Sequence, residues 1–327
     1  MDASLFRSIK DTAAVVSIPM RSRFRSVTER EALLFEGPNG WAEWAPFLEY
    51  EDEEASVWLN AAVEFAFGPE PQLKRTRIGV NATLGAVAAD KVAESLSHFG
   101  TFATVKIKVA EPGQSIEDDV ARVLRVRELY SDSKIRLDAN GGFEIAQAIE
   151  LVSELHRRGI ELEYFEQPCR TISDLAELRV ELHREGLSLA IAADESVRKA
   201  SDPLAVAQAG AAEILVLKVA PLGGVNRALS IASEAGLPVV VSSALDTSVG
   251  ISAGLQLAAA LPELSFDCGL ATTAMLIGDV TKQPLRAENG YLDYRRVEVA
   301  TSKLDVFRAE DHRVDWWMDR LERCARL

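Results

Sequence analysis

The chain has 327 residues, a length that suits two domains of ordinary size or one α/β barrel of about 250 residues with a smaller domain attached. Of these residues 48% are hydrophobic and 26% are charged, which is typical of a globular protein with a large core. Its 36 lysines and arginines are outnumbered by 50 aspartates and glutamates, and the net charge of −14 makes nucleic acids and anionic membranes poor partners.

The N-terminal part, residues 1–75, predicts a small α+β domain. Two apolar runs, at residues 13–18 and 30–35, have the composition of strands, and an arginine-rich loop at residues 21–25 lies between them. A helix is predicted over residues 51–66, which begin with acidic side chains. These elements do not repeat, so we expect a capping domain beside a larger unit.

From Arg77 onward, short apolar runs alternate with longer amphipathic segments, as in parallel strands joined by helices. Eight strands are predicted, at residues 78–81, 104–109, 135–138, 164–166, 189–193, 214–218, 239–242 and 264–267. Helices are predicted at residues 116–130, 143–158, 174–183, 225–235 and 249–261. Eight strands favour a closed barrel, because a ring has no unpaired edge. An open doubly wound sheet is the alternative, but its frequent GxGxxG turn is absent from the sequence.

The predicted fold class is therefore α/β, a modified TIM (β/α) barrel at residues 76–284 with the N-terminal α+β capping domain in front of it. The segment 285–327 no longer alternates, and it carries Trp316 and Trp317. We expect this segment to return to the capping domain and complete it, with the two tryptophans packed between the domains.

Charged residues stand at the ends of five consecutive predicted strands. The C-terminal ends of barrel strands surround the active site. In chain order the charged residues are Lys106, Lys108, Asp138, Glu166, Asp194 and Lys218. Each could have a structural role when taken alone, but the ordered set predicts one site at the mouth of the barrel.

Lys106 and Lys108 are two residues apart in a strand, so both side chains point to the same side. Their neighbours are valine and isoleucine, and an unpaired ammonium group is costly in such surroundings. An exposed face on an edge strand would explain this pair by itself. The charges on neighbouring strands favour the alternative, in which both lysines point into the barrel.

The three carboxylates have the chemistry of a metal site. Asp138, Glu166 and Asp194 each follow an apolar run, and 28 residues separate each from the next, about one strand–helix unit. Gathered at the barrel mouth they would repel one another unless a cation neutralised them, and oxygen ligands suit a hard ion such as Mg²⁺. Helix capping would explain any one aspartate, but not all three carboxylates in phase. Asn140 either orients the metal ligands or caps the next helix.

Lysines beside a divalent cation predict removal of a proton alpha to a carboxylate. Metal and ammonium groups would stabilise the two negative charges of the resulting enediolate. A lysine base needs a lowered pKa, which a second ammonium group and Mg²⁺ would provide. The expected ligands are Mg²⁺, with Mn²⁺ as a substitute, and a small-molecule carboxylate substrate.

The ordered set of charges resembles that of the enolase superfamily, in particular its muconate-lactonizing subgroup, where lysine bases act beside Mg²⁺. Within the subgroup, the short chain and the segments 21–25, 44–50 and 242–250 look like the o-succinylbenzoate synthases of the actinobacterial type. This resemblance covers nearly the whole chain. It implies a syn dehydration of 2-succinyl-6-hydroxy-2,4-cyclohexadiene-1-carboxylate to o-succinylbenzoate in menaquinone biosynthesis.

The resemblance also implies a role for each charged residue. Lys108 would remove the alpha proton and return it to the departing hydroxyl group, with Lys106 assisting electrostatically. Lys218 would lie over the opposite face of the ring and stabilise the enediolate. The three carboxylates at the strand ends would bind Mg²⁺.

Four further residues are candidates for substrate binding. Ser242 and Ser243 end the seventh strand and could receive the succinyl carboxylate, although a plain capping turn also explains them. Arg136 shares the inward side of Asp138 and could pair with substrate or neutralise a buried carboxylate. Arg23 belongs to a loop that could close over an anionic substrate, or to an ordinary charged surface.

Two other functions stay open. The first is racemisation of N-succinylamino acids, or another epimerase or cycloisomerase reaction of the subgroup, because two lysines on opposite faces of an enediolate suit two-base epimerisation. Dipeptide epimerases of the subgroup have Asp-x-Asp at the eighth strand, where this chain has Asp267-Cys-Gly269, and this difference disfavours dipeptide epimerisation. The second is a barrel that binds a dicarboxylate without converting it, although a binding protein has no need of three lysines.

No feature of the sequence predicts export or membrane insertion. No segment approaches the roughly 20 apolar residues of a membrane helix. The N-terminus has acidic residues and lacks the apolar stretch of a signal peptide, so a cytoplasmic location is expected. The oligomeric state is left open, with a monomer as one option.

Overall fold

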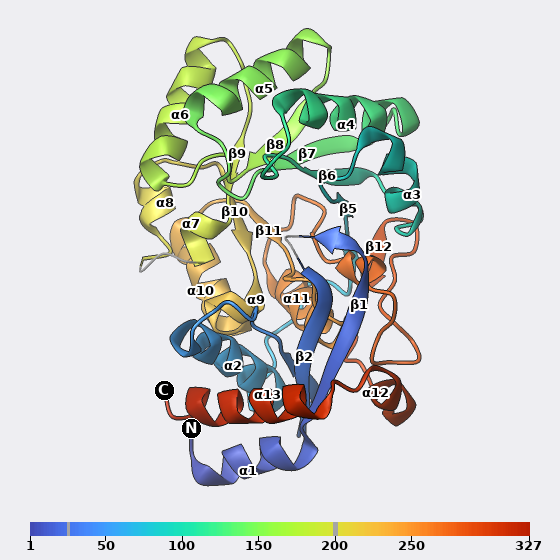
Figure 1. Ribbon diagram of the computed structural model, residues 1–327. Coiled ribbons are helices and arrows are strands. Elements are labelled where there is room, and N and C mark those ends of the chain that lie inside the picture. Colours follow the sequence, from blue (N-terminus) through green and yellow to red (C-terminus); the bar gives the residue numbers. More distant parts are fainter. Residues whose placement is uncertain (25–26, 199–201) are drawn as a thin grey trace.

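The computed structural model shows a barrel with a cap packed against it (Figure 1). It describes residues 1–24, 27–198 and 202–327, except for the side chains of Arg23 and Arg198. The cap lies at the lower end of the view together with both chain termini, and the long β1–β2 hairpin rises from it toward the barrel (Figure 1).

The cap contains a three-stranded antiparallel sheet in the order β1-β2-β3. Its elements are α1 (Ala3–Thr12), β1 (Ala14–Phe24), β2 (Val27–Gly37), β3 (Gly40–Trp44) and α2 (Asp52–Phe67). Strands β1 and β2 are longer than the predicted runs, because their pairing continues past Pro19 through a shift in register to the pair Phe24 and Val27. The prediction of a loop at residues 21–25 is therefore wrong for residues 21–24, which belong to β1.

Seven parallel strands form the barrel wall, in the spatial order β11-β10-β9-β8-β7-β6-β5. They are β5 (Ala82–Leu84), β6 (Thr104–Lys108), β7 (Lys134–Asp138), β8 (Leu162–Glu166), β9 (Ile191–Ala193), β10 (Ile214–Leu217) and β11 (Val239–Val241). Their order follows the chain without a reversal, as crossover helices on one face require. The predicted α/β barrel is confirmed, and the doubly wound sheet is wrong.

Helices connect the strands and cover the outside of the wall (Figure 1). They are η1 (Ala89–Lys91), α3 (Val92–Ser97), α4 (Ile116–Leu129), α5 (Ile145–Arg157), α6 (Ile172–Arg184), α7 (Glu195–Arg198), α8 (Ala205–Gln208), α9 (Val219–Leu222), α10 (Val225–Ala235) and α11 (Ser248–Ala260). Local signals fix several of these bounds. Ser115 and Asp118 form a capping box at the start of α4, and Gly236, in the left-handed conformation, ends α10.

Two strand predictions at the closure of the barrel are wrong. The segment predicted as the first barrel strand overlaps β4 (Arg77–Gly79), which pairs antiparallel with β12 (Tyr291–Asp293) outside the barrel. The first parallel strand is β5, immediately after it. No regular strand is found among the described residues at 264–267; instead Cys268 bridges to Val80 and Gly269 bridges to Ser242, which brings the two ends of the wall together.

The end of the chain returns to the cap. It comprises η2 (Thr272–Met275), β12, α12 (Thr301–Phe307) and α13 (Asp311–Cys324), with α12 beside β1 and α13 beside α2. Trp317 meets Trp44 of the cap edge to face, with ring centroids 5.2 Å apart, and its Nε1 donates to Glu31. The tryptophan therefore joins the C-terminal helix to the cap sheet, which corrects the prediction of a contact between cap and barrel.

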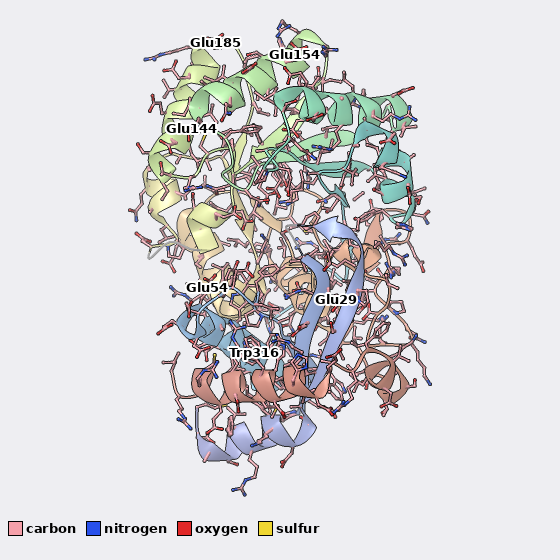
Figure 2. All side chains as sticks on the ribbon, in the orientation of Figure 1. Glu29, Glu54, Glu144, Glu154, Glu185 and Trp316 are labelled. Carbon is pink, nitrogen blue, oxygen red and sulfur yellow. The ribbon has the colours of Figure 1, made fainter. Side chains whose placement is uncertain are left out.

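Acidic side chains are spread over the outside of both parts. Glu29 on the cap and Glu144 and Glu185 on the barrel are exposed and stand away from the ribbon (Figure 2). Among the residues that the structure describes, no helix has the length and apolar character needed to cross a membrane.

Candidate active site

All six charged residues predicted at the strand ends meet at the mouth of the barrel and are buried. Lys106 and Lys108 belong to β6, which is paired on both sides, so the alternative of an exposed edge strand is wrong. Register places Lys108 beside Asp138, and Asp138 beside Glu166. The remaining two, Asp194 and Lys218, follow directly after β9 and β10.

Each of the three lysines at the mouth pairs with at least one carboxylate. Lys106 Nζ lies 2.8 Å from Glu166 Oε2 and 3.0 Å from Asp138 Oδ2. Lys108 Nζ lies 2.5 Å from the same Asp138 oxygen, and Lys218 Nζ pairs with Asp194 Oδ2. Because buried ions are costly without partners, this pairing explains how six charged groups share one buried site.

The electrostatics of the site depend on this pairing. Burial alone would lower the pKa of Lys106, but the carboxylates of Asp138 and Glu166 outweigh burial and raise it above its ordinary value. Burial and the neighbouring Asp138 carboxylate raise the pKa of Glu166 to about 7, although Lys106 opposes them. The carboxylate side of the site therefore still favours additional positive charge.

The site has the donor chemistry of a divalent cation site. Three carboxylates from consecutive strands supply only oxygen ligands, which suit a hard cation. Over the described ranges 1–24, 27–198 and 202–327, no three acidic, histidine or cysteine side chains are already gathered closely enough to hold a metal ion. The carboxylates instead contact the lysines, so binding of a cation requires these pairs to rearrange.

A pocket of about 400 Å³, including its opening, lies over the lysines. Lys106 and Lys108 line one side of it and Lys218 another, and Ser242 to Leu245 complete the barrel side. Phe24 and Phe47 of the cap also line it. Sequence reasoning missed these two aromatic residues, although both lie in segments whose likeness to known synthases it noted.

Comparison with known proteins identifies the family. The enolase C-terminal domain-like model matches residues 86–297, and the enolase N-terminal domain-like model matches residues 15–66. A protein named o-succinylbenzoate synthase from Mycobacterium tuberculosis is 48% identical over 320 residues, covering 98% of this chain and 95% of its own. A second, from Mycolicibacterium smegmatis, is 50% identical over 313 residues, covering 96% and 95%. The chain belongs to the o-succinylbenzoate synthase family.

Solved structures of more distant enolase-like proteins share the fold. A muconate lactonizing enzyme from Pseudomonas fluorescens superposes with a TM-score of 0.76 at 18% identity, covering 91% of this chain and 98% of that one. The L-Ala-D/L-Glu epimerase from Bacillus subtilis gives a TM-score of 0.74 at 21% identity, covering 88% and 96%. At this identity the likeness concerns the fold alone.

In this member of the o-succinylbenzoate synthase family, Arg136 lies one layer below the mouth. Its Nε donates to Glu163 Oε2 (2.6 Å), and its Nη1 donates to Asn81 Oδ1 (3.0 Å) and to the Asp267 carbonyl oxygen (2.6 Å). Its guanidinium also packs over the Tyr164 ring, 4.7 Å from the centroid. These contacts give the buried Arg136 guanidinium a partly buried carboxylate partner, Glu163.

Of the other three predicted binding residues, the structure describes the side chains of Ser242 and Ser243. Ser242 lines the pocket, and Ser243 Oγ donates to the Gly269 carbonyl oxygen (2.8 Å) and lies 2.7 Å from Thr272 Oγ1. The side chain of Arg23 lies outside the described part of the chain.

Asn140 was predicted either to orient the metal ligands or to cap the next helix, and its backbone nitrogen donates to Asp138 Oδ1 (3.2 Å). The residue before α5 is Glu144, so the capping alternative is wrong. Instead Lys108 Nζ donates to Asn140 Oδ1 (2.5 Å), and Asn140 Nδ2 donates to Glu195 Oε1 (3.2 Å). The backbone at Asn140 has a φ of 48°, a conformation that asparagine tolerates better than most residues. Asn140 thus links Lys108 to the segment that follows Asp194.

Proposed function

We propose that this protein catalyses the o-succinylbenzoate synthase reaction, the dehydration of 2-succinyl-6-hydroxy-2,4-cyclohexadiene-1-carboxylate to o-succinylbenzoate, in the cytoplasm and as a step of menaquinone biosynthesis. The observation that carries the proposal is the placement of three buried lysines among three carboxylates around one pocket. Relatives that are named for this activity match almost the full length of the chain.

Lys108, on β6, and Lys218, after β10, lie on opposite sides of the barrel mouth. The wall has eight positions, seven strands and the bridging segment at residues 268–269, and β6 and β10 are four positions apart. A flat ring bound between them would present one face to Lys108 and the other to Lys218. This arrangement supports removal of a proton on one face and stabilisation of the resulting negative charge from the other.

Lys108 is proposed to take the proton from the ring carbon that bears the carboxylate. The electron pair left on that carbon spreads into the carboxylate, giving an enediolate beside the ammonium groups of Lys106 and Lys218. The protonated Lys108 then gives its proton to the hydroxyl group on the same face, the carbon–oxygen bond breaks, and water leaves. The ring becomes aromatic, and Lys108 returns to its starting state.

Asp138, Glu166 and Asp194 are proposed to hold Mg²⁺, which Mn²⁺ could replace. When bound, the cation would supply positive charge to the two oxygens of the substrate carboxylate. The serine pair, Ser242 and Ser243, is proposed to face the succinyl group, since both lie at the end of β11 beside the pocket. Phe24 and Phe47 would exclude water from the cap side.

The test is loss of the cyclohexadiene absorbance when purified protein and Mg²⁺ are added to the substrate. The wild type is expected to turn the substrate over, and Lys108→Ala to lower kcat by roughly 10²- to 10⁴-fold, as removal of a general base does. Lys134→Ala is the matched control, because Lys134 lies on the neighbouring strand but is exposed and pairs with Glu163. This control should keep wild-type activity.

Other results would count against the proposal. If the Lys108→Ala variant were as active as the wild type, Lys108 could not be the base that removes the proton. A folded wild type that does not convert the substrate would contradict the synthase activity, and racemisation of N-succinylamino acids would then be measured. Two lysines facing one pocket from opposite sides also suit that reaction.

A further inference from the structure

The loop between β11 and α11, residues 242–247, separates two cavities. On one side, Ser242 to Leu245 line the pocket over the lysines. On the other side is a second pocket of about 510 Å³ between the loop and the cap, lined by Glu43, Asp246 and residues of α2 and α11. Lys218, Ser242 and Ala244 border both pockets. The loop therefore meets residues of the cap on the side that faces away from the lysines.

The loop has a conformation that needs support. Leu245 has a φ of 65°, which is unfavourable for a residue with a side chain. Asp246 Oδ2 accepts a hydrogen bond from the backbone nitrogen of Ala244 (3.0 Å), closing the loop on itself. A strained segment of this kind keeps its shape only when surrounding groups hold it.

One support is Arg30, which comes from β2 of the cap. Its Nε donates to the Leu245 carbonyl oxygen (3.3 Å), and its Nη2 donates to the Ala45 carbonyl oxygen. The guanidinium also lies over the Phe47 ring, 4.6 Å from the centroid. Because Phe47 and Leu245 both line the catalytic pocket, Arg30 connects the two walls behind it.

The other support is Glu43, which comes from β3 of the cap. Its carboxylate accepts hydrogen bonds from the backbone nitrogens of Thr247 (3.0 Å) and Gly250 (3.1 Å), and from Thr247 Oγ1. These donors lie at the start of α11, where backbone N–H groups lack partners within the helix. A Cβ at position 250 would lie 2.6 Å from Asp246 Cβ and 3.0 Å from the Glu43 carboxyl carbon, so only glycine allows this approach.

The same cap holds the barrel at a second place in a similar way. Glu64 of α2 accepts a hydrogen bond from the backbone nitrogen of Asn226 (3.1 Å), at the start of α10. Neither residue lines the pocket over the lysines. The two glutamates thus make the same kind of contact between cap and barrel, but only that of Glu43 reaches the loop beside the substrate pocket.

We propose that Glu43 and Arg30 are positioning residues that hold loop 242–247 where it binds the succinyl part of the substrate, without touching the substrate themselves. This inference rests on the proposed function, because it assigns the loop to substrate binding. It makes the cap part of the specificity of the enzyme through two side chains that face away from the reacting atoms. Loss of either side chain should weaken substrate binding and leave the chemistry at the lysines largely intact.

The test compares Glu43→Ala with Glu64→Ala in the full-length protein with Mg²⁺. Glu43→Ala is expected to raise KM about tenfold with little change in kcat, as when binding common to substrate and transition state is lost. Glu64→Ala should change neither constant, although both variants lose a contact between cap and barrel. Glu43→Gln, which keeps one acceptor oxygen, should restore most of the wild-type KM.

Hydrogen exchange of the backbone amides at residues 244–247 gives a second readout that needs no substrate. Faster exchange in Glu43→Ala but not in Glu64→Ala is expected. Equal effects of the two variants on KM and on exchange, or an unchanged KM and unchanged exchange in Glu43→Ala, would overturn the proposal. If the wild type fails to convert the substrate, the proposed function fails instead, and the exchange experiment still decides whether Glu43 holds the loop.

Discussion

Both ends of the wall formed by β6, β7 and β8 bury charged side chains, but with different partners. At the mouth, Lys106 pairs with Asp138 and Glu166 beside an open pocket. Two residues earlier on β7, Arg136 pairs with Glu163 and with groups from the closing segment of the barrel. From strand alternation alone, Arg136 and Asp138 are equivalent, since both point inward.

The difference lies in how replaceable the partners are. The lysines at the mouth have flexible stems and single ammonium groups, so a divalent cation can compete with them for the carboxylates. Arg136 offers a planar group that is held by a carboxylate, an amide oxygen, a backbone carbonyl oxygen and an aromatic ring. The mouth is therefore suited to change its contacts during a reaction, whereas the lower end is suited to hold strands together.

Removal of the metal is expected to have the largest effect on activity, and it tests whether the mouth binds a cation. Exhaustive chelation should abolish turnover, because the substrate carboxylate loses the positive charge that stabilises its proton removal. The far-ultraviolet circular dichroism should not change, because the lysines still neutralise the carboxylates. Addition of Mg²⁺ should restore activity. Full activity in the chelated protein would show that the three carboxylates do not form a metal site.

Carboxylate variants separate the two ends further. Asp194→Asn should weaken Mg²⁺ binding, measured by titration of activity with Mg²⁺. Glu163→Gln, which removes a carboxylate at the lower end, should leave the Mg²⁺ dependence unchanged.

Loss of Arg136 should affect stability more than catalysis. Arg136→Met leaves the Glu163 carboxylate and Asn81 without their buried partner, and breaking a buried pair costs about 3–5 kcal/mol. Urea unfolding should show this loss, while kcat/KM of the folded fraction stays close to that of the wild type. Lys134→Met removes the exposed partner of Glu163 and should cost much less. A large rise in KM without loss of stability would instead support the substrate-contacting alternative.

The pH dependence of stability should have opposite signs at two partly buried carboxylates, those of Glu43 and Glu163. Burial and the Asp246 carboxylate raise the pKa of Glu43 from its ordinary value of 4.5 to about 8, against the opposing effect of Arg30. Its contribution to the free energy of unfolding is therefore full below pH 4.5 and is lost as the pH rises through 8. Burial alone would raise the pKa of Glu163, but Arg136 and Lys134 outweigh burial and hold it below 4.5.

Urea unfolding of two variants between pH 3 and 9 measures this contrast, and the sign of each change is the prediction. Glu43→Gln should gain stability relative to the wild type as the pH rises from 5 to 8. Glu163→Gln should lose less stability than the wild type as the pH falls below 4.5, because its side chain no longer takes up a proton. Parallel curves for all three proteins would contradict both assignments.

Much of the barrel and of the site could be predicted from the sequence. Strands β6 to β11 and helices α4 to α6, α10 and α11 lie within a few residues of their predicted positions. The spacing of Asp138, Glu166 and Asp194 follows from the repeat of strand and helix, and this repeat is a local property of the chain. The alternation of side chains along β6 predicted that Lys106 and Lys108 lie on the same side, and the charges on neighbouring strands favoured the inside, where both are buried.

What the sequence did not determine depends on contacts between distant segments. Whether residues 78–81 or 82–84 form the first barrel strand is decided by pairing with β12 and β6, since both runs are short and apolar. The depth of Arg136 below the mouth depends on how the barrel closes around Asp267.

The contribution of the cap to the site also depends on contacts between segments that are distant in sequence. Phe24, Phe47 and Glu43 reach the pocket or its loop from strands and turns that are some two hundred residues away in sequence from the loop they approach. Periodicity fixes the local conformation and the side on which each residue lies, because these follow from backbone geometry within one element. The partner that each side chain meets is fixed only when cap and barrel pack together, because that choice depends on the path of the whole chain.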